Sequence, residues 1–453
     1  MNEQESNKNL SLLDRFNHWT ETSIMVRIFT VGIIILLLLI PVSMVENLIW
    51  ERQQRQKEAS SEISGKWGYA QTISGLVLTV PYKVYKTVYN KEREEYERLE
   101  EKKYAYFLPD DLAIDGVVSP EMRYRGIFQV IVYNAVLSVK GKFLQPDFRL
   151  LKIDEKDVLW EDASINLGVS DLRGLQEEVT LKWNKNSYAM NPGTTAERVL
   201  ERGINTPVLL SKEGEQYTFD ISLNFNGSSR LLFTPLGKVS NVHIASSWKD
   251  PSYTGAFLPD HREITEDGFT ADWKVLHLNR PYPQQFTGRV EGIDESTFGV
   301  NLIRPNDEYQ KSMRTAKYAV MFIALTFLVF FFSQTLNKVR IHPIQYIMVG
   351  LALCTFYVLL IALSEHIPFY LSYTAASTAI IVMITLYAHT IFKGTRITLM
   401  LGGIMTALYG FIYIIIQQED YALLIGSIGL FTILGGTMYL SRKIDWHNLE
   451  SKK

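Results

Sequence analysis

The sequence predicts a multi-span α-helical membrane protein with a large β-rich extracytoplasmic domain inserted between the first and second of six transmembrane helices. Two observations lead to this fold class. Six apolar segments each come close to the roughly 20 residues that a helix needs to cross a hydrocarbon core. A long polar and charged stretch, residues 46–317, separates the first of these segments from the other five.

The apolar segments contain almost no ionisable residue, His389 being the main exception. The first of them, IFTVGIIILLLLIPVSMV, is longer than the apolar region of a signal peptide, and no small-residue cleavage site follows it. We therefore interpret it as a retained anchor. The expected membrane helices lie at residues 27–45, 318–336, 343–363, 371–391, 397–416 and 421–440.

The charges of the short loops predict the orientation, because lysine and arginine mark cytoplasmic loops. The basic residues on one side are Lys338, Arg340, Lys393, Arg396, Arg442 and Lys443. The acidic residues of the opposite loops are Glu365, Glu419 and Asp420. We expect a cytoplasmic amino-terminal segment (1–26), a periplasmic domain (46–317) and a cytoplasmic tail (441–453).

Two shorter stretches favour helix next to the first span. In residues 1–26, Leu12, Phe16 and Trp19 fall near one helical face, which suits an amphipathic segment in the membrane interface or an extension of the first span. Residues 46–64, ENLIWERQQRQKEASSEIS, are predicted to continue the first span as a polar helix into the outer domain.

The rest of the outer domain has the composition of β-structure. GLVLTVPYKVYKTVY is rich in Val, Thr and Tyr, and we expect it to form a long hairpin whose tip is the charged run at 90–103. Several more short strands indicate an antiparallel sandwich or a strongly curved sheet. The further candidates are GIFQVIVYNAVLSVKGKF, EEVTLKW, YTFDISLNFNG, RLLFTP and VSNVHIASSW.

A weak repeat also occurs in this domain. FLPD is found at 107–110 and at 257–260, and Asp115-Gly116 and Asp267-Gly268 follow the two copies. Proline suits a strand end and Asp-Gly suits a turn. We therefore interpret the repeat as structural rather than functional. It suggests two related β units that face each other.

Composition and motifs argue against several classes of function. A net charge of −2 gives no reason to expect a nucleic-acid partner. The single cysteine, Cys354, excludes an intrachain disulfide and a thiolate metal cluster. The sequence contains no P-loop, GxSxG, HExxH or GxGxxG motif, so we expect no enzyme and no cofactor. The outer histidines His243, His261 and His277 stand 18 and 16 residues apart, unlike a local metal-binding pair, which leaves only a distributed site open.

The candidate functional residues lie at the ends of the spans. Glu365 and His366 leave the third span on the predicted periplasmic side, where an acid and an imidazole suit pH sensing or a proton relay. Neighbours on a helix point about 100° apart, so the two can equally be polar residues that end a span. Weaker candidates are His342, Gln345, Tyr346 and His389 at the other membrane face, although His342-Pro343 is also typical of a helix start.

Several stretches together resemble the CreD family of bacterial inner-membrane proteins. They are TAKYAVMFIALTFLVFFF, HPIQYIMVGLALCTFYVLLIALSEH, SRKIDW, the ER-x-x-R pattern at 51–55, the strand entry from Gly75 to Val80-Pro81, W-x-x-P-S-Y from Trp248, and FLPD. The resemblance implies an inner-membrane protein of Gram-negative bacteria that is associated with cell-envelope integrity and with a response controlled by a two-component system. The family brings no catalytic residue to carry over.

Two positions depart from the family pattern. This chain has Gly75-Leu76 where Gly-Pro is usual, and Trp248-Lys249-Asp250-Pro251-Ser252 where Trp-Pro-His-Pro-Ser is common. The missing histidine argues against an obligatory metal site in that loop. Ser364-Glu365-His366, in contrast, matches the family block and so gains weight as a functional site.

Three functions are compatible with these features. The first is a non-enzymatic protein that supports envelope integrity and the envelope-stress response, with membrane lipids, other envelope proteins or peptidoglycan-related material as partners. The second is a transporter or exporter of a small or amphipathic envelope-related substrate, which would need a polar cavity joining His389, Gln345 and Tyr346. The third is an enzyme of the periplasmic domain acting on envelope material, which would need a groove with convergent carboxylates.

Overall fold

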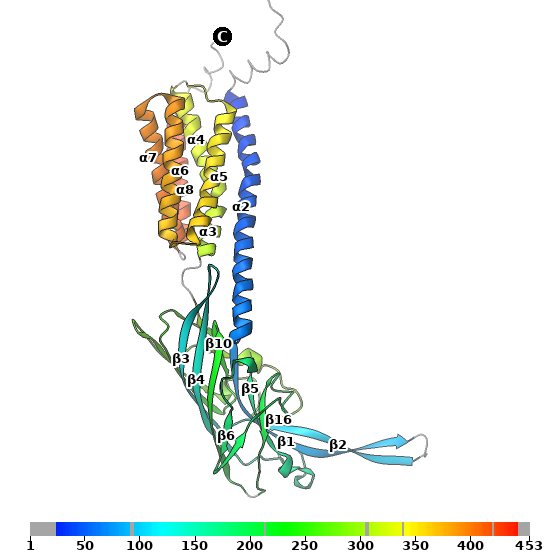
Figure 1. The fold of residues 1–453 in the computed structure, drawn as a ribbon. Helices are drawn as coiled ribbons and strands as arrows, with labels where there is room; N and C mark the ends of the chain where they lie inside the picture. Colours follow the sequence, from blue (N-terminus) through cyan, green and yellow to red (C-terminus); the bar gives the residue numbers. More distant parts are fainter. Residues whose placement is uncertain are drawn as a thin grey trace, which may run out of the picture. The chain divides into compact units, whose positions relative to one another are not determined.

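The computed structural model describes residues 24–90, 95–212, 214–303, 308–337, 339–418 and 421–442. The chain divides into two compact units (Figure 1). Residues Met1–Arg55 and Asn306–Lys453 make the helical unit, and residues Gln56–Pro305 make the β unit. The predicted amphipathic segment around Leu12, Phe16 and Trp19 lies outside the described residues.

Six helices of the described chain are long and apolar enough to span a membrane, and the β-rich segment lies between the first and the second of them. Their number and order agree with the six predicted helices and with a β-rich domain inserted between the first two. The polar stretch 46–64 is helical, as expected, since α2 runs without a break to Trp67. The helices are α2 (Ile24–Trp67), the short α3 (Glu308–Lys317), α4 (Ala319–Asn337), α5 (Pro343–Ser364), α6 (Phe369–Phe392), α7 (Thr395–Gln417) and α8 (Ala422–Ser441).

The helical unit is held together by close backbone approach and by an aromatic core. A Cβ atom on Gly350 of α5 would lie 2.1 Å from Leu38 Cδ1 of α2, so glycine leaves room for this leucine between the two helices. Farther along, Phe356 stacks edge-on against Tyr409 at 4.9 Å between ring centroids. The Tyr373 hydroxyl donates a hydrogen bond of 2.8 Å to the Tyr409 carbonyl, which satisfies a buried polar group inside an apolar core.

The β unit contains two mixed sheets. One follows the order β13-β17-β11-β1-β5-β9-β8 with β2 and β16 attached at β1, and the other the order β14-β15-β12-β3-β4-β10-β6-β7. The expectation of purely antiparallel pairing is wrong in two places, because β1 pairs parallel with β11 and β3 pairs parallel with β12. Such parallel neighbours come from distant parts of the chain, which local sequence patterns do not reveal.

The strands have the following bounds. In the first sheet they are β1 (Gln71–Asn90), β2 (Glu95–Phe107), β5 (Ser164–Val169), β8 (Asn191–Pro192), β9 (Gly203–Pro207), β11 (Arg230–Thr234), β13 (Pro251–Gly255), β16 (Gln285–Thr287) and β17 (Phe298–Leu302). In the second they are β3 (Asp111–Arg125), β4 (Phe128–Leu144), β6 (Thr180–Trp183), β7 (Asn186–Ala189), β10 (Gln216–Ser228), β12 (Val239–Ser246), β14 (His261–Thr265) and β15 (Gly268–Leu276).

One hydrophobic core joins the two sheets. Residues of both, among them Leu78 of β1 and Ile114 of β3, are fully or almost fully buried in the same cluster. Along β3 the buried and exposed residues alternate, with Leu112 and Ile114 buried and Ala113 and Asp115 exposed. The sheets therefore form a sandwich, and the second sheet keeps one face free of the core.

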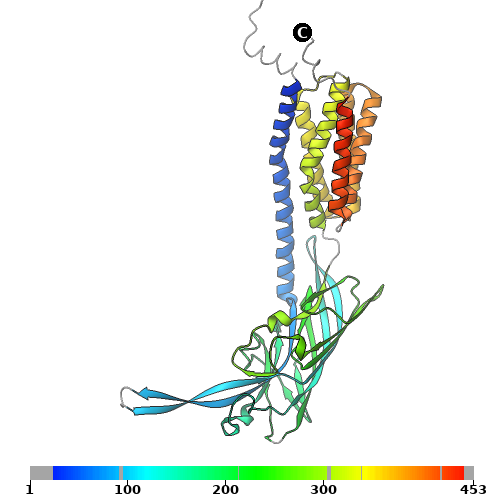
Figure 2. The same cartoon turned by 180° about the vertical axis from the view of Figure 1, so that it is seen from behind.

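The long hairpin is confirmed, since β1 and β2 pair antiparallel from Leu78 and Phe107 outward to Asn90 and Glu95. Figures 1 and 2 show it extending beyond the rest of the β unit. Of the charged run at 90–103, Asn90 ends β1 and residues 95–103 lie in β2 and pair with β1, while residues 91–94 are outside the described chain.

The FLPD repeat builds the same contact twice. Asp110 donates its N–H to the Lys142 carbonyl, and its carboxylate accepts the N–H of Leu144 at 2.8 Å. Asp260 does the same with the Asp272 carbonyl and, at 2.7 Å, the Lys274 N–H. Both copies start an antiparallel pair in one and the same sheet, so the suggestion of two facing β units is wrong. Asp115-Gly116 is not a turn either, because it lies in the middle of β3.

Candidate functional site

Glu365 lies at the carboxyl end of α5, where the chain turns into α6. Its N–H donates to the Ile361 carbonyl at 3.2 Å, and Pro368 precedes the first residue of α6. Although it ends an apolar helix, its side chain is only 10% exposed. A carboxylate shielded to this degree needs partners, because an unpaired charge away from water is costly.

Two side chains from other helices supply them. Arg52 Nε of α2 lies 3.6 Å from Glu365 Oε1, and the Tyr309 hydroxyl of α3 donates a hydrogen bond of 3.2 Å to the same oxygen. We call Arg52, Tyr309 and Glu365 the Glu365 cluster. It joins three helices of the helical unit through one carboxylate oxygen.

The protonation of the cluster follows from its surroundings. Burial raises the pKa of Tyr309, and the neighbouring charge of Glu365 raises it further, so the hydroxyl keeps its proton and remains a donor. Arg52 carries a permanent charge that balances the carboxylate. The cluster therefore contains one charge-balanced ion pair near the ends of the membrane spans.

The cluster also has a particular place in the chain. Arg52 comes four residues before Gln56, where the β unit begins, and Tyr309 comes four residues after Pro305, where it ends. Both connections to the β unit thus contact Glu365 inside the helical unit.

His366 does not share this environment. Its residue is exposed, and its N–H donates to the Leu363 carbonyl at 2.9 Å. The structure therefore places the two neighbours differently, with Glu365 in a three-helix contact and His366 at the surface. The pair does not form the joint site that a proton relay between them would need.

At the opposite end of the helical unit, three of the weaker candidates come together. The His342 ring accepts the N–H of Ile344 at 3.3 Å, and Gln345 accepts the N–H of His342 at 2.9 Å. This reciprocal capping agrees with the interpretation of His342-Pro343 as a helix start. Tyr346 is buried and donates to Gln334 at 2.8 Å. These residues line a pocket of about 440 Å³.

His389 is placed elsewhere. Its Nδ1 lies 3.4 Å from the Thr398 hydroxyl, which links α6 to α7. It is not among the described residues that line the pocket of Gln345 and Tyr346. The described chain thus lacks the polar cavity that would join all three residues.

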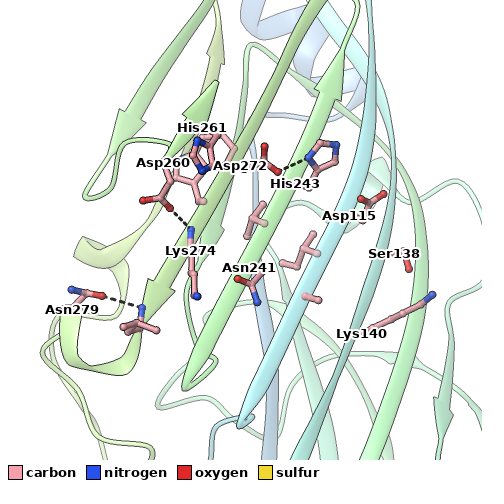
Figure 3. A pocket seen from close by; sticks show the side chains of 15 residues that line it. Asp115, Ser138, Lys140, Asn241, His243, Asp260, His261, Asp272, Lys274 and Asn279 are labelled. Atoms are coloured by element: carbon pink, nitrogen blue, oxygen red, sulfur yellow. Dashed lines mark hydrogen bonds and ion pairs between the residues drawn. The ribbon is translucent and has the colours of Figure 1, made fainter. Parts of the chain in front are cut away.

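A second polar surface lies on the free face of the eight-stranded sheet. Across adjacent strands, Asp115 pairs in register with His243, His243 with Asp272, and Asp272 with His261. We call these four residues the His-Asp row. It lines an open pocket of about 890 Å³, together with Lys140 and other residues (Figure 3).

Only part of the His-Asp row is directly bonded. His243 Nδ1 lies 2.6 Å from Asp272 Oδ1, and these side chains are 43% and 48% exposed. Asp260, also in the pocket, is engaged by the Lys274 N–H described above (Figure 3). Among the residues that the structure describes, no group of three or more His, Cys, Asp or Glu side chains is arranged to hold a metal ion.

Sequence reasoning missed the partners of Glu365 and the His-Asp row. Arg52 falls in the ER-x-x-R pattern, but nothing in its spacing connects it with residue 365. Tyr309 carries no local signal at all. The row was hidden because its members are up to 157 positions apart in the chain, from Asp115 to Asp272, and meet only through sheet pairing.

Comparison with known proteins gives the relationship of the whole chain. The family model described as "Inner membrane protein CreD" matches residues 23–447. The inner membrane protein CreD of Escherichia coli (strain K12) is 31% identical over 421 residues, which cover 91% of this chain and 91% of that protein. The match includes all six candidate spans and the β-rich segment between them. The chain therefore belongs to the CreD family of inner membrane proteins.

Proposed function

We propose that this inner membrane protein supports cell-envelope integrity and the envelope-stress response without catalysing a reaction. In this proposal residues 46–317 are periplasmic, both termini are cytoplasmic, and the β unit and the helical unit contact lipids, envelope proteins or peptidoglycan-related material. The Glu365 cluster is the observation that carries the proposal, because it fixes both connections of the β unit to one point of the membrane bundle.

The physical reason is mechanical. A domain attached through two connections can pass load to the membrane helices through each of them. Arg52 and Tyr309 supply an anchor on each side, and their shared oxygen makes the two contacts dependent on each other. Load on the β unit would therefore weaken the contacts of Arg52 and Tyr309 with Glu365.

The test is complementation of a strain that lacks the protein. Wild type, Glu365→Gln, Arg52→Gln and Tyr309→Phe are expressed at matched membrane levels, and survival is scored under detergent, β-lactam and bacteriocin stress. We expect all three variants to lose protection. The exposed neighbour gives the matched control, since His366→Gln should protect like wild type.

Three results would contradict the proposal. Full protection by Glu365→Gln would show that the cluster has only a structural role. A deletion strain with a normal stress profile would remove the proposed function itself. Loss of protection by His366→Gln alone would move the site from the cluster to the exposed histidine.

A second candidate function is an enzyme of the β unit acting on envelope material. The specific observation is the 2.6 Å contact of His243 Nδ1 with Asp272 in an open pocket. When a carboxylate holds the Nδ1 proton, Nε2 is left with the basic lone pair that a general base needs. Asp115 provides the further carboxylate on the same face.

Complementation of the same deletion strain tests this enzymatic function. His243→Gln and Asp272→Asn should then lose protection while Glu365→Gln keeps it, and the composition of the peptidoglycan should change in the two pocket variants. Protection by both pocket variants, with unchanged envelope composition, excludes the enzyme. The described residues do not support transport through these candidates, since His389 does not line the pocket of Gln345 and Tyr346.

A further inference from the structure

The pocket at the amino-terminal end of α5 lies outside the proposed function. Its walls come from α2, from the end of α4, and from the segment that enters α5. The described residues that line it are Arg27, Thr30, Val31, Gln334, Arg340, Ile341, His342, Pro343, Gln345 and Tyr346. Two of these residues, Arg27 and Arg340, are permanently cationic.

The floor of the pocket is fixed by internal hydrogen bonds. Tyr346 and Gln334 are each only 4% exposed, and they bond to each other at 2.8 Å. His342 and Gln345 cap the first turn of α5 reciprocally. These contacts set the shape of the pocket without any ligand.

The pocket contains two cationic side chains that suit an anionic ligand. Arg27 comes from α2 and Arg340 from the segment before α5, so two separate elements bring positive charge to one cavity. The amino-terminal end of the 22-residue helix α5 adds its partial positive charge at the same place. Guanidinium groups match the oxygen geometry of phosphate in particular.

The surroundings select a lipid as the source of this phosphate. Arg27 stands at the start of the first span and Arg340 between two spans, at the end of the bundle that the loop charges predict to be cytoplasmic. Beside the lining residues, Ile28, Ile344 and Met348 are 44%, 60% and 54% exposed, which suits contact with acyl chains. Basic pockets between membrane helices on this side typically bind anionic headgroups.

We propose that this pocket binds the headgroup phosphate of an anionic phospholipid. Arg27 and Arg340 hold the phosphate, and the apolar side chains beside them contact the lipid tails. The inference is independent of the Glu365 cluster, which involves other residues at the other end of the helical unit. It assigns the bundle a bound lipid that belongs to its structure.

The experiment uses the full-length protein purified in detergent. Binding of phosphatidylglycerol is measured by native mass spectrometry and by its effect on thermal unfolding, with zwitterionic phosphatidylcholine as the comparison lipid. We expect phosphatidylglycerol to bind and stabilise the wild type. Arg27→Gln and Arg340→Gln should each weaken its binding by about tenfold, because each removes a charge-assisted contact.

The matched control is Arg396→Gln. Arg396 lies in the first turn of α7, carries the same charge, and does not line the pocket. It should bind phosphatidylglycerol like the wild type. Equal losses in Arg396→Gln and Arg340→Gln would show nonspecific attraction to basic loops, and unchanged binding by the Arg27→Gln, Arg340→Gln double variant would overturn the site.

A competition with the wild type separates the two sources of phosphate and does not depend on any variant folding. Inorganic phosphate and glycerol 3-phosphate are added to the lipid-bound protein. Retention of phosphatidylglycerol supports the lipid assignment. Displacement of phosphatidylglycerol by comparable concentrations of either soluble phosphate would overturn the lipid assignment. The pocket would then be a site for a soluble phosphate.

Discussion

The Tyr309 hydroxyl donates its hydrogen bond to the same Glu365 oxygen that faces Arg52, so the tyrosine and the arginine depend on one acceptor. This shared Glu365 oxygen links α3 to α2 through α5. The arrangement makes a clear prediction for a variant that lacks only the hydroxyl.

Tyr309→Phe should lower the free energy of unfolding of the helical unit by about 1–2 kcal/mol, since a hydrogen bond to a charged group is lost and the carboxylate stays shielded. Thermal unfolding of the purified protein in detergent measures the change. The control is Tyr370→Phe, because Tyr370 is 54% exposed and its hydroxyl supports no such contact. An unfolding midpoint equal to wild type for Tyr309→Phe would contradict the importance of the bond.

Acid should destabilise the β unit through Asp171. Burial raises the pKa of this carboxyl, but the hydrogen bonds from Arg173 and from the Tyr69 N–H outweigh burial and leave the pKa below its ordinary value of 3.8. A carboxyl with a lowered folded pKa stabilises the fold fully above its unfolded pKa. That stability is lost as the pH falls below 3.8 through the folded pKa.

The measurement is tryptophan-fluorescence unfolding of wild type and Asp171→Asn at neutral pH and in steps through acid pH. The variant should be less stable at neutral pH and should lose less stability on acidification. Asp267→Asn, at an exposed carboxylate in the turn after β14, should follow the wild-type curve. Parallel curves for wild type and Asp171→Asn would show that other groups cause the acid sensitivity.

A larger side chain at Gly350 should displace its neighbours. An added Cβ would lie 2.1 Å from Leu38 Cδ1 and 3.1 Å from Phe327 Cζ, so Gly350→Ala should destabilise the packing of α2 on α5 by about 1–3 kcal/mol. Unfolding of the purified variants reports the change.

Trimming the opposing side chain should offset part of this loss. In the background of Gly350→Ala, Leu38→Ala should cost less than it does in the wild type, because the methyl group then finds room. Gly403→Ala is the matched control, since a Cβ there meets no atom within 4 Å. Additive losses in the double variant would place the strain elsewhere.

Local patterns were enough to predict the membrane helices and most of the long strands. The apolar segments are determined by length and composition, and β1, β4 and β10 are rich in β-branched and aromatic residues. Strand β3 was missed because Asp115-Gly116 resembles a turn. In the sheet, Gly116 instead makes room for Leu137, since a Cβ there would lie 2.2 Å from Leu137 Cδ2.

The candidate site was predicted only in part, because its contacts are non-local. The sequence singled out Glu365 by its place at the end of an apolar helix, and it could not identify which distant residues compensate its charge. The spacing of His243 and His261 argued against a local metal-binding pair and left only a distributed site open. The structure brings both histidines to Asp272, since β12 and β14 flank β15.

The Glu365 cluster also affects the conformational entropy that the β unit gains on unfolding. Arg52 and Tyr309 are 257 residues apart in the chain, yet both contact one carboxylate. While the cluster holds, the unfolded β unit remains a closed loop, and a closed loop has less conformational entropy to gain than a chain with free ends. The attached domain therefore melts later than the same segment would alone, and it refolds from ends that are already joined.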